Sequence, residues 1–243
     1  MVGCALPSFL PAPVKLMSFH AVDFWIVITH LGAAGIMLPL FLVIAAELWL
    51  AGQKSDLLAW MVAISAGGAI VLASKIAFIG WGWGSASLNF TGISGHTMLA
   101  TSILPVWMGR LLAEPDRRFS LSGVSLGLAI GAAVGVSRLA LGAHSPSEVM
   151  AGWFLGLAIS LTAYKVMRHR RAVQGVAGLA GVFLLLAFSP SWSGYFPTHK
   201  WEVDIALAMS RHAQPYVRQD LHRPLRESAS EFSWRDQARN AQR

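Results

Sequence analysis

Polar residues that could do chemistry gather in a few short clusters at the ends of apolar stretches. One cluster is the stretch 144–148, His-Ser-Pro-Ser-Glu, and Arg138 lies six residues before His144. An imidazole can attack an electrophile or move a proton, a carboxylate can orient the ring, and a guanidinium binds anions. Ionisable groups close to a membrane are costly, so this cluster is a candidate functional site.

Glu148 has two compatible interpretations. Ser145, Pro146 and Glu148 stand at the N-cap, N1 and N3 positions expected of a capping box, in which Glu148 accepts a hydrogen bond from a backbone N–H. In the functional interpretation the carboxylate orients one ring nitrogen of His144 and leaves the other free to attack.

A second cluster, Ser94-Gly95-His96, opens another apolar run, and Lys75 lies inside a third. A helix N-terminus with a glycine and a serine can bind phosphate, and His96 could protonate a leaving oxygen. The structural alternatives are a capping turn for Ser94 and Gly95, and a Lys75 side chain that extends toward the membrane surface.

Metal binding is the competing chemistry for these residues. His96, His144 and Glu148 would make a site of two histidines and one carboxylate. Lys75 and Arg138 argue against it, because cations attract an anionic substrate and repel a metal. The pattern favours one shared phosphate.

The composition predicts a membrane protein rather than an ordinary soluble domain. The 243 residues are 55% hydrophobic and 13% charged. The single cysteine, Cys4, excludes an internal disulfide and a cysteine-based metal site. The net charge of +7 lies in short loops and in the tail, so we expect no nucleic-acid partner.

We expect an all-α polytopic bundle of about six transmembrane helices, since a span takes roughly 20 apolar residues. An N-terminal segment 1–23 that could lie at the membrane interface would precede the bundle at 24–190, and an aromatic then polar tail would follow at 191–243. The candidate spans are 24–48, 57–80, 96–114, 121–139, 147–166 and 172–189.

Loop charges and glycine spacing predict where the clusters lie. Lys54, Arg110 and the basic residues around 117 and 168 fall in alternate loops, which should be cytoplasmic, so loops 81–95 and 140–146 should face outward. Glycines recur every fourth residue in 123–135, and Glu148 is spaced likewise before two glycines of the fifth span. A close approach of these two helices would bring Arg138 and Glu148 to one outer pocket.

These residues resemble the signatures of the type-2 phosphatidic acid phosphatase superfamily. Ser137-Arg138, His144 and Glu148 are similar to its third signature, Ser94-Gly95-His96 to its second, and Lys75 to the start of its first. The resemblance covers roughly residues 35–170.

The resemblance implies a role for each of these residues. His144 would be the nucleophile that forms a phosphohistidine, His96 the acid, and Glu148 the residue that orients His144. Lys75, Ser94, Gly95 and Arg138 would hold the phosphate. The resemblance further implies an enzyme without metal or cofactor, acting on a lipid phosphate or pyrophosphate in a bacterial inner membrane, with the site facing the periplasm.

The sequence departs from the family pattern at three positions. Gly82 stands where the first signature has arginine, Ile93 replaces a proline, and Glu148 replaces an aspartate. A charged contact to phosphate is stronger than a neutral one, so the loss at position 82 is the most serious. The candidates to replace that arginine are His30, His199, Lys200 and Arg211, and the sequence does not choose among them.

Two other functions remain open at this stage. The missing arginine is compatible with a non-catalytic relative that binds or transports phospholipids. The same histidine could also transfer phosphate from one lipid to another. The sequence does not identify the lipid or the oligomeric state.

Overall fold

The computed structural model describes residues 19–113, 120–167 and 198–222. These residues form helices joined by loops, and the only strand-like pairing among them is an isolated bridge between Ser85 and Phe90. The predicted all-α class is therefore confirmed. In chain order the elements are α2 Phe19–His30, α3 Ala34–Leu50, α4 Lys54–Trp81, α5 Gly95–Leu111, α6 Leu121–Ala140, α7 Pro146–Val166, α10 Thr198–Ser210 and the 3-10 turn η2 Arg218–His222.

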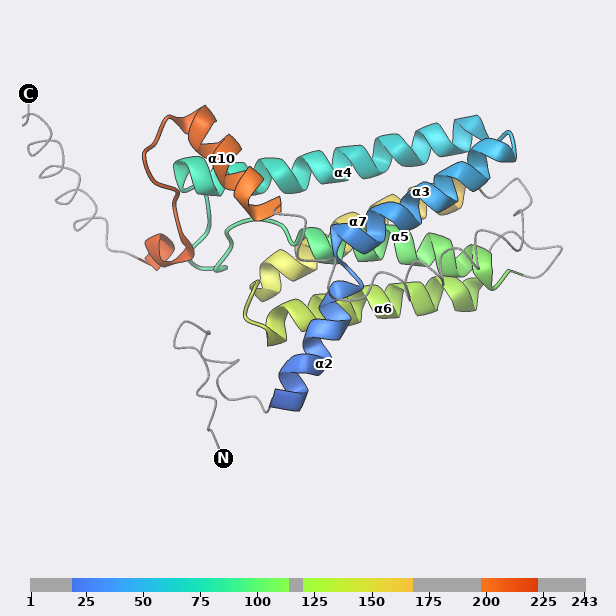
Figure 1. Ribbon diagram of the computed structural model, residues 1–243, viewed down its shortest axis with the longest axis horizontal. Coiled ribbons are helices and arrows are strands. Elements are labelled where there is room, and N and C mark those ends of the chain that lie inside the picture. The colour runs from blue at the N-terminus through green and yellow to red at the C-terminus, as the bar shows by residue number, and fades with distance from the viewer. Residues whose placement is uncertain (1–18, 114–119, 168–197, 223–243) are drawn as a thin grey trace, which may run out of the picture.

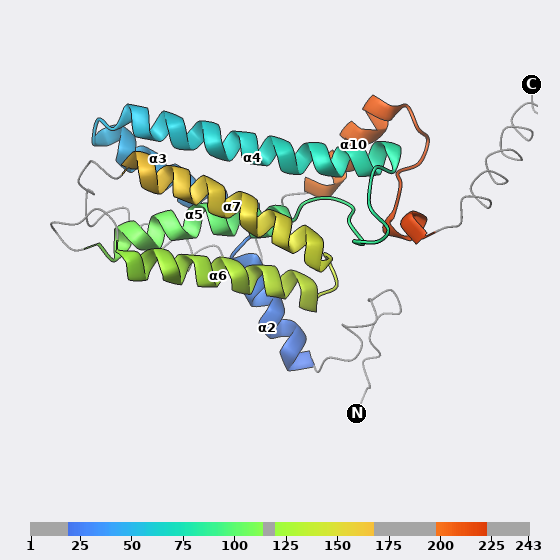
Figure 2. The same ribbon diagram turned by 180° about the vertical axis from the view of Figure 1, so that it is seen from behind.

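The central element of the bundle is α5, with α3, α4, α6 and α7 packed around it (Figures 1 and 2). Buried side chains occur along its whole length, and they include the polar Thr97, Thr101 and Ser102. The Thr97 and Ser102 hydroxyls are hydrogen-bonded, to Ser94 and to the Leu99 carbonyl, while the Thr101 hydroxyl has no partner within the described part of the chain. The enclosed location of α5 explains why it is the least apolar of the predicted spans.

Glycines allow the helices beside α5 to approach it closely. A Cβ at Gly127 of α6 would lie 2.5 Å from the Pro105 backbone, and one at Gly152 of α7 would lie 2.5 Å from the Ser94 carbonyl oxygen. Both glycine stripes therefore pack against α5. Near the C-terminus of α6 the expected close approach to α7 is also present, because a Cβ on Gly135 would lie 2.8 Å from the Val149 side chain.

Within the described residues, four segments are long and apolar enough to cross a membrane, and the chain is an integral membrane protein. They are Val22–Leu50, Lys54–Trp81, Leu121–Ala140 and Pro146–Val166. The first is interrupted between α2 and α3, where a Cβ on Gly32 would lie 2.8 Å from the His96 carbonyl oxygen. The sixth candidate span, 172–189, lies outside the described residues.

The sequence places Arg110 in a loop, but the structure places it in a helix. It lies in the last turn of α5, is 6% exposed, and forms an ion pair with Glu47 of α3. A buried, paired arginine carries little information about which side of a membrane a loop occupies. The orientation prediction therefore depends on the remaining basic residues.

The C-terminal part of the described chain returns to one end of the bundle. The helix α10 crosses the end of α4, and η2 lies beside it (Figure 1). An apolar cluster of Ile76, Phe78, Ile79 and Ala206 joins the two helices, and Leu221 of η2 packs against it. This arrangement places residues 198–222 next to the loops that precede α5 and α7.

Candidate active site

The N-terminus of α7 carries the capping box that the sequence predicts. The Ser145 hydroxyl accepts from the Glu148 N–H, and Glu148 Oε2 accepts from the Ser145 N–H at 3.0 Å. Pro146 occupies the first turn, where a missing N–H costs nothing. The cap fixes the start of the helix and thereby the direction of the Glu148 side chain.

Glu148 also contacts the histidine. His144 Nδ1 lies 2.7 Å from Glu148 Oε2, and the Glu148 side chain is wholly buried. Thr91 donates to the other oxygen, through its N–H at 2.6 Å and its hydroxyl at 2.7 Å. Glu148 makes the capping contact and the His144 contact together, because a carboxylate has enough lone pairs for both.

His144 lies in the turn between α6 and α7. Its N–H and that of Ala143 both donate to the Arg138 carbonyl, at 3.3 and 3.0 Å, so the turn is tied to the end of α6. Burial lowers the pKa of His144 below its ordinary value, although the hydrogen bond and the charge of Glu148 act in the opposite direction. Burial therefore favours the neutral form of the ring.

The start of α5 lies against the start of α7. The Ser94 N–H donates to the Glu148 backbone carbonyl at 3.1 Å, and the wholly buried Ser94 hydroxyl pairs with Thr97 at 2.9 Å. A Cβ on Gly95 would meet only Val71, at 3.6 Å. The described protein atoms therefore leave room above the Gly95 backbone.

Two further predicted residues, His96 and Arg138, lie near His144. His96 interacts electrostatically with Arg138, His144 and Lys75. Arg138 Nη1 donates to the Thr29 hydroxyl at 2.9 Å, while its buried Nε has no hydrogen-bond partner within the described part of the chain. A buried donor of this kind suits an anionic ligand.

Lys75 already holds a carboxylate. Its ammonium lies 2.7 Å from Glu202 Oε1 of α10, and both side chains are largely buried. The Lys75 ammonium therefore has a specific partner within the protein. A phosphate that binds Lys75 has to compete with Glu202 for it.

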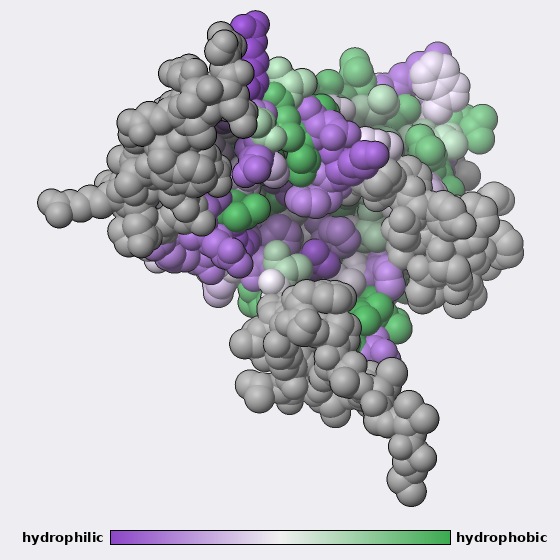
Figure 3. Space-filling view, turned by 60° about the vertical axis from the view of Figure 1, so that its left-hand side comes forward, coloured by the Kyte–Doolittle hydropathy of each residue, from purple (hydrophilic) through white to green (hydrophobic). Residues whose placement is uncertain are grey.

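A cavity of about 270 Å³ opens at this end of the molecule, where Figure 3 shows hydrophilic side chains gathered between apolar ones. His144 and Lys75 line it, whereas Ser94, Gly95, His96 and Arg138 do not. Its polar lining residues are Lys75, Thr91, His144, His199, Glu202 and Arg218.

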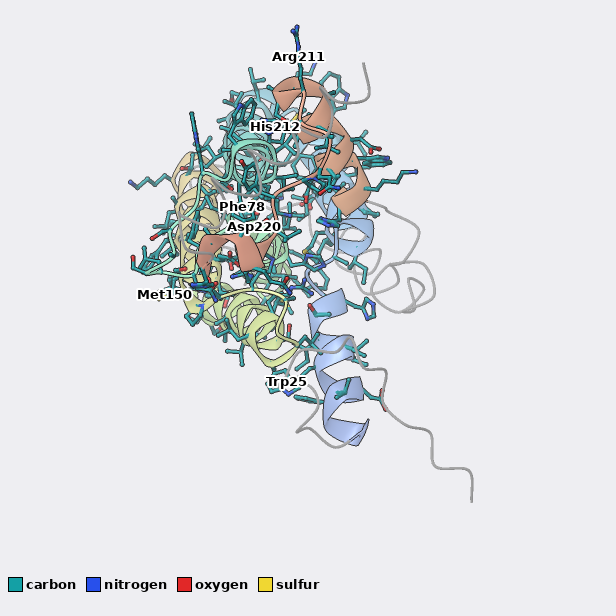
Figure 4. The ribbon with its side chains drawn as sticks, turned by 90° about the vertical axis from the view of Figure 1, so that its left-hand side faces the viewer. Trp25, Phe78, Met150, Arg211, His212 and Asp220 are labelled. Carbon is teal, nitrogen blue, oxygen red and sulfur yellow. The ribbon has the colours of Figure 1, made fainter. Side chains whose placement is uncertain are left out.

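Two residues of the site, Arg218 and Glu202, belong to none of the sequence motifs. Arg218 Nη2 donates to both oxygens of Glu148, at 2.9 and 2.8 Å. The charged tail has no spacing that links it to the motifs, so no sequence signal pointed to these residues. Of the four candidates to replace the missing arginine, His199 lines the cavity, but Arg211 is exposed and extends away from the bundle (Figure 4).

No metal site is evident among the residues that the structure describes, where no three His, Cys, Asp or Glu side chains form a group able to hold an ion. His144 Nδ1 faces Glu148, and Arg218 takes the remaining face of that carboxylate. The arrangement is suited instead to binding an anion beside an oriented imidazole.

The chain is similar to one known protein family and to known proteins. The sequence model of the PAP2 superfamily matches residues 73–172, which contain Lys75, His96, Arg138 and His144. A Klebsiella pneumoniae protein, described as an uncharacterized 22.5 kDa protein in the cps region, is 37% identical over 213 residues, covering 82% of this chain and 98% of that protein. A transmembrane PAP2 type phosphatidylglycerolphosphate phosphatase from Bacillus subtilis has a similar structure, with a TM-score of 0.49 and 24% identity, over 63% of this chain and 80% of that one.

Proposed function

The chain belongs to the PAP2 superfamily, and from this premise we propose that it is a metal-independent membrane phosphatase acting on a lipid phosphate or lipid pyrophosphate. The observation that carries the proposal is the contact between His144 Nδ1 and the buried Glu148, at the wall of a cavity that Lys75 also lines. An oriented neutral imidazole beside a cation is suited to attack on a phosphate group.

The reaction would proceed in two steps. The second ring nitrogen of His144, Nε2, attacks phosphorus and forms a P–N bond while the bond from phosphorus to the lipid oxygen breaks. His96 gives a proton to that leaving oxygen. Water then attacks the phosphohistidine, the P–N bond breaks, inorganic phosphate leaves, and a proton from the water returns to His96.

The phosphate would be held by residues from three helices. The unpaired Nε of Arg138 supports a role in binding an oxyanion, and the open space above Gly95 supports close approach to the N-terminus of α5. Lys75 would exchange Glu202 for the phosphate. Ser94 would contribute its hydroxyl after turning it away from Thr97.

We further propose that the protein lies in a bacterial inner membrane with this site on the outer side. Loop 81–95, which joins α4 to α5 at the site, contains no charged residue, whereas Arg117 and Arg118 follow α5 at its other end. Positively charged loops remain on the cytoplasmic side. A lipid substrate would then reach the cavity from the outer leaflet.

The test is release of inorganic phosphate by the detergent-purified protein. We would assay phosphatidic acid, phosphatidylglycerol phosphate, a polyprenyl pyrophosphate and a lipid A phosphate, each with a chelator present. His144→Ala is the test variant. His222→Ala is the matched control, because His222 is exposed and outside the cavity.

Chelator-resistant release that disappears in His144→Ala and persists in His222→Ala is the expected result. Release that persists in His144→Ala would refute the proposed nucleophile. If phosphate appears on an acceptor lipid and not in water, the protein is a phosphotransferase. Binding of these lipids without any turnover would make it a non-catalytic relative.

A further inference from the structure

Residues 212–218 are attached to the end of α4 by specific contacts. His212 Nδ1 donates to the Gly80 carbonyl at 2.7 Å, and the Tyr216 N–H donates to the Ile79 carbonyl at 2.9 Å. Figure 4 shows this segment running across the end of the bundle, from His212 to Asp220 in η2. The segment has a defined position there, so its side chains can take part in the site.

Tyr216 covers the glycine that ends α4. Gly82 adopts a left-handed conformation with φ of +71°, and a Cβ at this position would lie 3.1 Å from the Tyr216 ring. A side chain on residue 82 would therefore be strained by its backbone and obstructed by Tyr216. The C-terminal segment takes the place that a side chain from the end of α4 would use.

Arg218 follows Tyr216 by two residues and reaches Glu148. Its Nη2 lies 2.9 and 2.8 Å from the two Glu148 oxygens and 3.1 Å from the Thr91 hydroxyl. Its Nη1 donates to the Asn89 carbonyl at 2.7 Å. The guanidinium thus joins the loop before α5 to the N-terminus of α7.

Charge explains why Glu148 needs this partner. A wholly buried carboxylate is unfavourable unless a cation and hydrogen bonds compensate it. His144 cannot be that cation while it is the neutral nucleophile. Among the described residues, Arg218 is the only lysine or arginine that forms an ion pair with Glu148.

We propose that Arg218 is a positioning residue of the active site, supplied by the C-terminal segment that covers Gly82. It holds Glu148 in the conformation that orients His144. This inference rests on the proposed function for its kinetic test. The segment 212–218 is then part of the enzyme's site.

The experiment compares Arg218→Gln and Arg218→Lys with Arg211→Gln. Arg211→Gln removes the same charge from the residue just before that segment, at an exposed position outside the cavity. We expect kcat to fall about 10- to 100-fold in Arg218→Gln, because the charged hydrogen bonds from Arg218 to Glu148 are lost. Arg218→Lys should recover part of this loss, and Arg211→Gln should match the unmodified protein.

A second readout needs no substrate. The pKa of His144 can be measured from its rate of modification by diethyl pyrocarbonate at several pH values, with the site identified by mass spectrometry. Glu148, Arg138 and Lys75 are the charged groups that act on this ring. Arg218 offsets part of the negative charge of Glu148. Without Arg218, that charge stabilises the protonated form of His144 more strongly, so the pKa of His144 should rise.

A lowered kcat together with a raised His144 pKa in Arg218→Gln supports the proposal. An unchanged kcat overturns it, and so does a fall in kcat without a change in the His144 pKa, because that indicates a structural effect only. If the unmodified protein releases no phosphate from any lipid, the proposed function fails. The pKa of His144 in Arg218→Gln still tests the contact in that case.

Discussion

Replacing Glu148 by glutamine tests the geometry of the site most directly. Glu148 Oε1 accepts from the Thr91 N–H, and Oε2 accepts from the Ser145 N–H. An amide has one oxygen and one NH₂ group, so in either orientation its NH₂ faces a backbone N–H that cannot rotate away. His144 and Arg218, which also need an acceptor here, lose the negative charge.

The expected losses of stability and of activity follow from these contacts. One buried donor left without an acceptor lowers the free energy of unfolding by about 1–3 kcal/mol. The effect on rate should be larger, because the amide no longer selects the ring tautomer with a proton on Nδ1. In the Ser-His-Asp triad the equivalent change lowers kcat about 10⁴-fold, and we expect Glu148→Gln to lower kcat by about 10²- to 10⁴-fold.

The assay is kcat and KM for the best lipid phosphate of the panel, at a temperature where thermal unfolding shows every variant to be folded. Asp23→Asn is the matched control, since Asp23 is exposed on α2. Glu148→Asp keeps the charge and should retain more activity than Glu148→Gln. A folded Glu148→Gln protein with an unchanged kcat would refute the view that this carboxylate orients His144.

Two further predictions concern pH and packing. Protonation removes the attacking lone pair of His144, and burial lowers the pKa of His144 from 6.5, so the loss of kcat on the acidic side should begin only below pH 6.5. A fall that begins above pH 6.5 in a kcat–pH profile would contradict this. Gly127→Ala should destabilise the protein by about 1–3 kcal/mol, because the new Cβ would meet the Pro105 backbone at 2.5 Å. Thermal unfolding in detergent measures this, with Gly68→Ala, whose Cβ meets nothing within 4 Å, expected to show no loss; equal midpoints for both variants would contradict the packing argument.

Local features of the site could be predicted because their causes lie within a few residues. His144 and Glu148 are four residues apart at a helix start, and a capping box needs only the sequence from Ser145 to Glu148. Long apolar runs specify helices wherever backbone groups must be paired without water. These rules gave the helical class and the histidine–carboxylate pair.

Contacts between distant segments could not be predicted in this way. Arg218 is 70 residues from Glu148, and Glu202 is 127 residues from Lys75. No periodicity or motif connects such positions, because their meeting depends on how α10 and residues 212–218 pack against the end of α4.

The sequence by itself determined the all-α class, the apolar spans and the local pair of His144 and Glu148. Only the tertiary structure decided that both glycine stripes face α5, that Glu202 pairs with Lys75, and that Arg218 approaches Glu148 beside Gly82. The physical reason is the distance along the chain over which each interaction acts. Helix propensity and capping act within one or two turns, whereas charge compensation and close packing depend on which distant surfaces fit together.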